Sequence, residues 1–128
     1  MHALPRGFTL IEQLAVIALV GTASATALPA LVDLRAQADD TTLASLAAAA
    51  GSAMVLNQAG CLVTQQQVVA GKCQPVRDCR DVGALLHGDI PAGYAVPAQP
   101  LASDGGRCQL QRQRDGAAVA FHGVATAH

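Results

Sequence analysis

The residues with the most defined chemistry are four cysteines, which all follow Gly60. They are Cys61, Cys73, Cys79 and Cys108. An even number of cysteines in a small exported domain favours disulfide bonds, and four cysteines allow three different pairings. The competing chemistry is a structural zinc site, but the sequence has no C-x2-C pair and no histidine pair at ligand spacing. We therefore expect two disulfide bonds, no metal and no other cofactor.

Residue types that carry catalysis are sparse in this chain. Glu12 is the only glutamate, and the histidines are scattered as His2, His87, His122 and His128. The sequence contains no nucleophile elbow, phosphate-binding loop, H-E-x-x-H motif or paired carboxylates. The formal net charge of −1 also excludes a general electrostatic attraction to nucleic acid. We therefore expect that the protein is not an enzyme.

Three arginines form a small basic cluster near the C-terminus: Arg107, Arg112 and Arg114. They lie in residues 107–114, where apolar and polar residues alternate, which predicts a strand. The simplest interpretation is a solvated strand face. The functional alternative is a contact with DNA or an anionic host surface, because an assembly of many copies multiplies weak contacts.

An uncharged stretch of 20 residues, from Gln13 to Val32, is long enough to cross the roughly 30 Å of a bilayer core as a helix. Arg6 gives it a positive flank, which directs the chain to a membrane with its N-terminus in the cytoplasm. Glu12 stands at the front edge, and a carboxylate at the bilayer centre without a partner costs about 2.5–3.5 kcal/mol. The alternative is an ordinary signal peptide, with A-x-A cleavage sites at 23–25 and 25–27.

The segment Gly7-Phe8-Thr9-Leu10-Ile11-Glu12, followed by the apolar run and Pro29, resembles the class III signal of type IV prepilins. The resemblance implies cleavage after Gly7 by a prepilin peptidase, methylation of the new amine of Phe8, and retention of the helix. It also implies that Glu12 pairs with the N-terminal amine of a neighbouring subunit in a filament. The alternative is a pairing within the same chain, since Phe8 and Glu12 share one helix face.

The periodicity and the resemblance together divide the chain into four segments. These are a leader (1–7), a hydrophobic transmembrane and assembly helix (8–32), an amphipathic helix (33–59) and a disulfide-bonded globular head (60–128). We expect Pro29 to kink the helix without ending it, and Gly60 to end it. The resemblance further implies that the helix partly unwinds between Gly21 and Pro29 in a filament.

The expected fold class is α+β: a long N-terminal helix, half in the membrane and half amphipathic, packed on a small antiparallel sheet, as in type IV pilins. The expected elements of the head are a capped turn of helix at 81–86, strands at 94–99, 107–114 and 117–124, and a hairpin turn at 115–116. The resemblance favours Cys79–Cys108 as the C-terminal bridge. Cys61–Cys73 would then close the loop after the helix.

The resemblance implies a structural subunit of a type IV pilus that supports adhesion, twitching motility or DNA uptake. Its expected partners are other copies in a helical filament, the prepilin peptidase and the pilus assembly platform. The chain would reside in the bacterial inner membrane before assembly and in the extracellular pilus, or fimbrium, afterwards. A minor pilin or a type II secretion pseudopilin is the alternative within the family. A secreted, disulfide-bonded binding domain is the alternative from another class.

Overall fold

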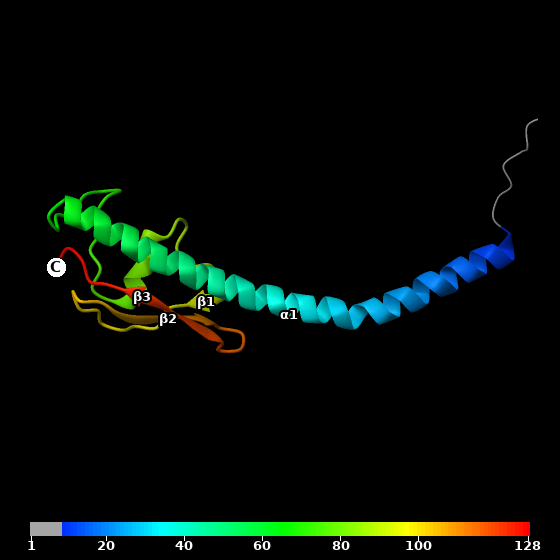
Figure 1. Cartoon of the computed structure of the whole chain (residues 1–128). Helices are drawn as coiled ribbons and strands as arrows, with labels where there is room; N and C mark the ends of the chain where they lie inside the picture. The colour runs from blue at the N-terminus through cyan, green and yellow to red at the C-terminus, as the bar shows by residue number, and fades with distance from the viewer. Residues whose placement is uncertain (1–8) are drawn as a thin grey trace, which may run out of the picture. The chain divides into compact units, whose positions relative to one another are not determined.

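The computed structural model describes residues 9–128, except for the side chains of residues 23–32. The leader and the predicted cleavage residues Gly7 and Phe8 lie outside the described residues. Five elements follow one another in the chain (Figure 1): α1 (Leu10–Val63), the 3-10 helix η1 (Cys79–Leu85), β1 (Tyr94–Ala95), β2 (Gly106–Arg112) and β3 (Ala118–Gly123). The chain divides into two compact units, Met1–Asp39 and Asp40–His128, which are described separately.

The three strands form an antiparallel sheet in the order β1-β2-β3, with Leu110 opposite Val119 at the centre of the β2–β3 pairing. The loop between β2 and β3 covers residues 113–117, and Gly116 takes its left-handed position at φ +74°. The hairpin predicted at 115–116 is therefore present, with a longer loop than two residues. β1 is shorter than the predicted strand 94–99, because Pro97 has no N–H to continue the ladder.

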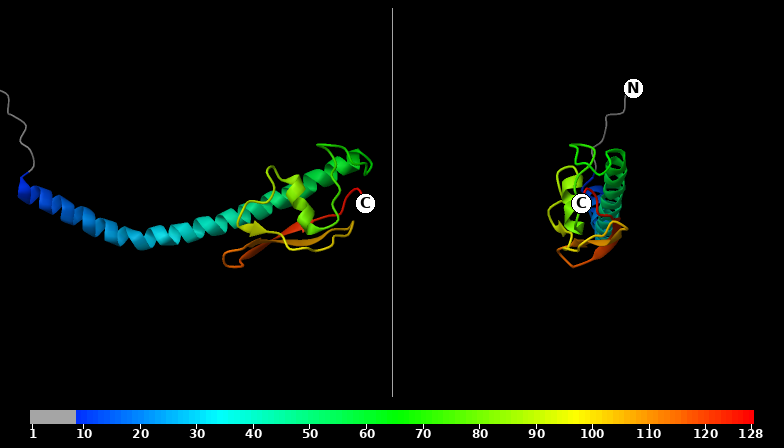
Figure 2. Two further views of the ribbon diagram at one scale, coloured as in Figure 1. Left: turned by 180° about the vertical axis from the view of Figure 1, so that it is seen from behind. Right: turned by 90° about the vertical axis from the view of Figure 1, so that its left-hand side faces the viewer.

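Within the unit Asp40–His128, α1 lies along one face of the sheet (Figure 2). Its buried side chains recur every three to four residues, at Leu43, Ala47, Ala50 and Met54. They share one core with residues of η1 and the strands, among them Val76, Val82, Leu110 and Phe121. This long N-terminal helix and small antiparallel sheet confirm the predicted α+β class.

η1 begins two residues earlier than the predicted turn at 81–86 because its cap is Asp78. The Asp78 carboxylate accepts from the backbone N–H of Arg80, and the Asp81 carboxylate accepts from the backbone N–H of Asp78. This reciprocal arrangement is a capping box. The N–H of Arg80 also lowers the pKa of Asp78, because it stabilises the ionised form.

The sequence predicted that the helix ends at Gly60. This prediction is wrong, because α1 continues to Val63. Gly60 instead lies where the helix touches the following loop, and a Cβ atom there would collide with the carbonyl oxygen of Lys72. The next residue, Cys61, is bonded to Cys73 and holds this loop against the helix. The glycine is therefore required for close packing rather than for a change of backbone direction.

We expect Gly60→Ala to destabilise the head by about 1–3 kcal/mol, because the overlapping atom belongs to backbone held by a disulfide. Gly51→Ala is the matched control, since its Cβ would lie 3.6 Å from the Cβ of Phe121, an ordinary contact. The control should be neutral or stabilising by up to about 1 kcal/mol from helix propensity. Urea unfolding of the full chain in detergent measures both, and equal effects would contradict the packing argument.

Candidate functional site

Glu12, the predicted assembly residue, forms a reciprocal cap with Thr9 at the start of α1. The backbone N–H of Thr9 donates to the Glu12 carboxylate at 3.2 Å, and the Thr9 hydroxyl accepts from the backbone N–H of Glu12 at 3.2 Å. This capping box satisfies two N–H groups at the helix start and explains why α1 begins at Leu10. The cap was not predicted, although the T-x-x-E spacing is its sequence signature.

The Glu12 side chain is exposed, so its carboxylate retains lone pairs for a further donor. The predicted partner is the amine that cleavage would create at Phe8, which lies outside the described residues. The pairing of Glu12 with an amine, in its own chain or in a neighbour, therefore stays a prediction. The same holds for the predicted kink at Pro29, a position through which α1 runs as one helix.

The first part of α1, Leu10–Thr22, is apolar and exposed in every direction around the helix axis. Ile11, Val16 and Ile17 are 80%, 52% and 68% exposed. At 3.6 residues per turn these three side chains point to three different sides of the helix. A helix that is apolar all round needs an apolar environment on all sides, which is lipid or other apolar helices.

Among the residues that the structure describes in full, one helical segment near the N-terminus, Asp33–Val63, is long and apolar enough to cross a membrane. Alanine is its commonest residue, and its inner face, including Leu43 and Met54, packs in the core of the head. That arrangement is typical of the core helix of a globular domain. The predicted membrane segment 8–32 contains residues 23–32, whose side chains are not described, and its membrane insertion stays a prediction.

The four cysteines form two disulfide bonds, Cys61–Cys73 and Cys79–Cys108, with Cα–Cα distances of 4.6 and 5.6 Å. Both favoured pairings are thus confirmed. All four sulfur atoms belong to fully buried residues. The first bond closes the loop after α1, and the second joins η1 to the central strand. Each bond contributes roughly 2–4 kcal/mol by restricting the unfolded chain.

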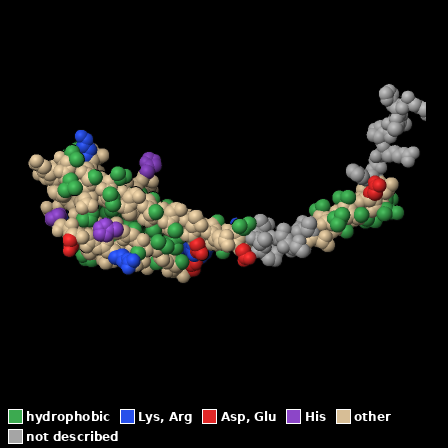
Figure 3. Space-filling model, in the orientation of Figure 1, with side chains coloured by type: hydrophobic (Ala, Val, Ile, Leu, Met, Phe, Trp, Pro, Cys, Tyr) green, Lys and Arg blue, Asp and Glu red, His purple; other side chains and the backbone are tan. Residues whose placement is uncertain are grey.

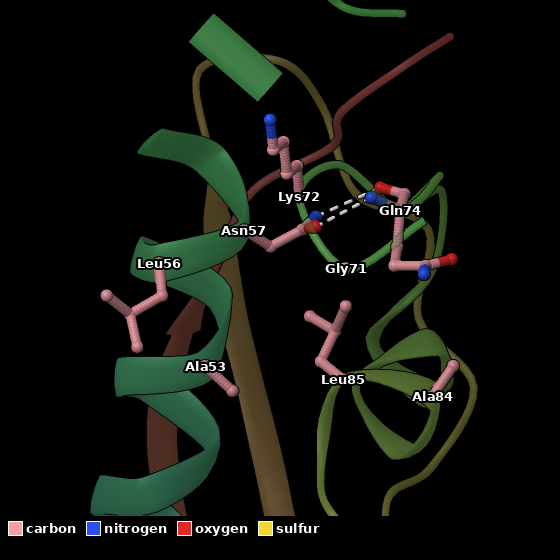
Figure 4. A pocket seen from close by; sticks show the side chains of 8 residues that line it. All are labelled: Ala53, Leu56, Asn57, Gly71, Lys72, Gln74, Ala84 and Leu85. Atoms are coloured by element: carbon pink, nitrogen blue, oxygen red, sulfur yellow. Dashed lines mark hydrogen bonds between the residues drawn. The ribbon is translucent and has the colours of Figure 1, made fainter. Parts of the chain in front are cut away.

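A buried amide joins α1 to the disulfide-closed loop and to the C-terminal segment. The Asn57 side chain accepts from the backbone N–H of Gln74 at 2.8 Å and donates to the Gln74 carbonyl at 2.9 Å (Figure 4). It also donates to the Thr126 hydroxyl at 3.0 Å. These contacts lie beside a surface hollow of about 300 Å³, which is lined by apolar residues together with Lys72. The role of Asn57 was not predicted, because both partners are distant in sequence.

The predicted basic cluster is not present as a group, because Arg112 faces inward. Arg112 is only 8% exposed, and its guanidinium donates to Asp115 at 2.7 and 3.0 Å and to Asp40 of α1 at 3.1 Å. Its charge is therefore compensated within the chain, and Arg112 does not present an exposed cation as expected. Its contact with DNA or a surface stays a prediction. The ion pairs hold the β2–β3 loop against α1.

These ion pairs change the acid–base behaviour of the loop. The Arg112 guanidinium holds the pKa of Asp115 well below its usual range, and the backbone N–H of Ala117 acts in the same direction. A carboxyl with a depressed folded pKa contributes stability above its unfolded pKa of about 3.9. That contribution is lost as the pH falls through the folded value.

We expect the unfolding temperature of the wild-type chain to fall as the pH is lowered from about 4, and Asp115→Asn to flatten this dependence. Asp104→Asn is the matched control, because Asp104 is an exposed turn residue outside the ion-pair network. Thermal unfolding followed by circular dichroism between pH 2 and about pH 7 measures the slopes. A slope in Asp115→Asn equal to the wild-type slope would refute the assignment.

The other two arginines of the cluster, Arg107 and Arg114, are exposed. Arg107 lies on β2 directly opposite His122 of β3, whereas Arg114 lies in the β2–β3 loop. In β2 the buried side chains alternate with less buried ones, so Arg107 and Arg112 face opposite sides of the sheet. The structure therefore separates the predicted cluster into one buried and two exposed residues.

Comparison with known proteins gives no match to a protein family, to a curated protein or to a solved structure. Among the described residues, no group of three or more histidine, cysteine, aspartate or glutamate side chains is placed to hold a metal ion.

Proposed function

We propose that this protein is a type IV pilin-like subunit, held in the membrane by the N-terminal part of α1 and polymerised through that helix into a filament. The observation that carries the proposal is the all-round exposure of apolar side chains in Leu10–Thr22. Only Thr9 separates this stretch from the Gly7-Phe8 pair, and the stretch contains Glu12 at the expected spacing. A helix of this kind finds a stable environment in lipid and then among identical helices.

The outward face of α1 in the head supports the same proposal. From Thr41 to Gly71 the chain carries no charged residue. Most exposed residues on this face of the helix are small, including Ala44, Ala48 and Ser52, and they are joined by the exposed apolar residues Val55 and Leu56. Small side chains allow two helices to approach closely, and removing an uncharged surface from water costs little free energy of desolvation. Both properties suit contacts between copies in a filament.

The alternatives within the prepilin group are a minor pilin and a type II secretion pseudopilin. Major pseudopilins often carry a calcium site near the C-terminus, for which this chain offers Asp104 and Asp115. Both carboxylate oxygens of Asp115 accept hydrogen bonds from Arg112. A carboxylate committed to an arginine is a poor calcium ligand, which favours the pilin over the calcium-binding pseudopilin.

The processing site gives the most direct test. A prepilin predicts a mature chain that begins at N-methylated Phe8 and retains the whole of α1. An ordinary secreted domain predicts a chain that begins near Thr26 or Leu28, after the A-x-A sites. N-terminal sequencing and intact mass of the protein from membranes distinguish the two. A start near Thr26 would rule out the pilin proposal.

The charge of Glu12 can be tested separately from its capping role. Gln accepts the same capping hydrogen bond as Glu but carries no charge, so Glu12→Gln keeps the cap with Thr9 and removes the ion pair. We expect Glu12→Gln to abolish filaments while the membrane-bound chain remains at normal levels. Thr9→Ala, which removes the hydroxyl of the cap, should still assemble.

Electron microscopy of sheared filaments and immunoblots of the membrane fraction provide the two measurements. Normal filaments from Glu12→Gln would show that the charge of Glu12 is not needed for assembly. Loss of filaments in Thr9→Ala alone would assign the requirement to the helix cap instead.

A further inference from the structure

The head contains two Asp-Gly pairs, Asp104-Gly105 and Asp115-Gly116. Glycine has no Cβ, so it shields its own backbone nitrogen less than any other residue. In an Asp-Gly pair this nitrogen lies within reach of the preceding side-chain carboxyl carbon, with which it closes a five-membered ring. Each pair is therefore a candidate site for a spontaneous change of the main chain from an α-linkage to a β-linkage.

The two pairs have the same local structure. Each aspartate is exposed and lies in a turn. Each glycine has a positive φ, +93° at Gly105 and +74° at Gly116. The N–H of Gly105 donates to the carbonyl oxygen of Ala102 at 3.1 Å, and the N–H of Gly116 donates to that of Arg112 at 2.8 Å. Neither exposure nor the hydrogen bonding of the glycine amide therefore distinguishes the two pairs.

The two carboxylates differ in what they bind. Both oxygens of Asp115 accept hydrogen bonds from the Arg112 guanidinium, at 3.0 and 2.7 Å, and one of them also accepts from the backbone N–H of Ala117 at 3.1 Å. The Asp104 carboxylate makes no hydrogen bond or ion pair with the residues that the structure describes. The face of the head drawn in Figure 3 shows both situations, an acidic side chain with no Lys or Arg side chain beside it and others that lie against basic ones.

The hydrogen bonds of Asp115 protect it in two ways. They have to break before the carboxyl carbon turns toward the Gly116 nitrogen. Ring closure also releases the carboxyl OH as water and so requires the protonated form, and the Arg112 guanidinium holds the pKa of Asp115 well below its usual range. Each unit of depression lowers the protonated fraction about 10-fold at a pH well above the pKa. Asp104 has no such hydrogen bonds to break.

We propose that Asp104 is a site of spontaneous isoaspartate formation and that Asp115 is not. The Gly105 nitrogen attacks the side-chain carboxyl carbon of Asp104. A C–N bond forms, and the amide proton leaves with the carboxyl OH as water. Water then adds to the original main-chain carbonyl of the succinimide ring and breaks its bond to the nitrogen. The product is an isomer of the original chain, because one water is lost and one is gained, and nothing is oxidised or reduced.

The modification changes the entry to β2 and leaves the core in place. The β-linkage adds a methylene group to the main chain before Gly105 and leaves a free α-carboxylate at Asp104. Gly105 lies against the His122 ring, because a Cβ atom there would collide with Cε1 and Nε2 of the ring. Further along β2, Cys108 is bonded to Cys79. We therefore expect a displaced His122 ring on an otherwise intact head. The free α-carboxylate is the group that isoaspartate methyltransferases esterify with S-adenosylmethionine.

The test ages the full-length chain in neutral detergent, at mildly acidic pH and below its unfolding temperature. Mass spectrometry of the peptides locates the isoaspartate, and methyl transfer from S-adenosylmethionine by a protein isoaspartate methyltransferase measures its amount. We expect isoaspartate to accumulate at least about 10-fold faster at Asp104 than at Asp115. In the reduced chain in urea the tertiary contacts are absent, and the two Asp-Gly pairs should react at similar rates.

Asp104→Glu is the matched control, because it keeps the charge, whereas the longer side chain would have to close a larger ring. It should abolish the modification at this position and leave Asp115 unreacted. Arg112→Gln should raise the rate at Asp115 toward that at Asp104. Equal rates at the two aspartates of the folded wild-type chain would overturn the proposal, as would an unreacted Asp104 under conditions where the unfolded chain reacts. An unchanged rate at Asp115 in a folded Arg112→Gln chain would also overturn it.

Discussion

The structure of the head depends on a small core between α1 and the sheet that contains few large side chains. The chain has one tyrosine, two phenylalanines and no tryptophan. The helix contributes alanines such as Ala47 and Ala50 to the core, and Gly51 brings its backbone near Phe121. Each alanine buries little area, so this core gains less from the hydrophobic effect than one built from large residues. Other links have to hold the two layers together.

Those links lie at three places in the head. Cys61–Cys73 closes the loop at the end of α1, and Cys79–Cys108 joins η1 to the central strand. Arg112 binds the β2–β3 loop to Asp40 at the other end of the head's helix. The covalent links restrict the unfolded chain, whereas the ion pair acts in the folded state and is sensitive to acid. Together they fix the sheet on the helix without a large core.

The two outer faces of the head differ in the charges that they carry. Arg112 is paired with Asp40 and Asp115, whereas on the outer face of the sheet the exposed Arg107 lies beside neutral amides. From Thr41 onward the exposed face of α1 carries no charge, and most of its residues are small. The two faces therefore differ in chemistry: the helix face is uncharged, whereas the sheet face carries an exposed arginine.

The sequence by itself determined the elements, because their signals come from neighbouring residues. The three-to-four spacing that leads to Met54, the alternation around Leu110 and the turn at Gly116 predicted the long helix and the hairpin. Tertiary structure alone decided which residues meet across the fold. The partner of Arg112 on α1 is 72 residues away, and the constraint on Gly60 comes from the backbone of a later loop. Local periodicity places a residue on a face, but only packing shows what that face touches.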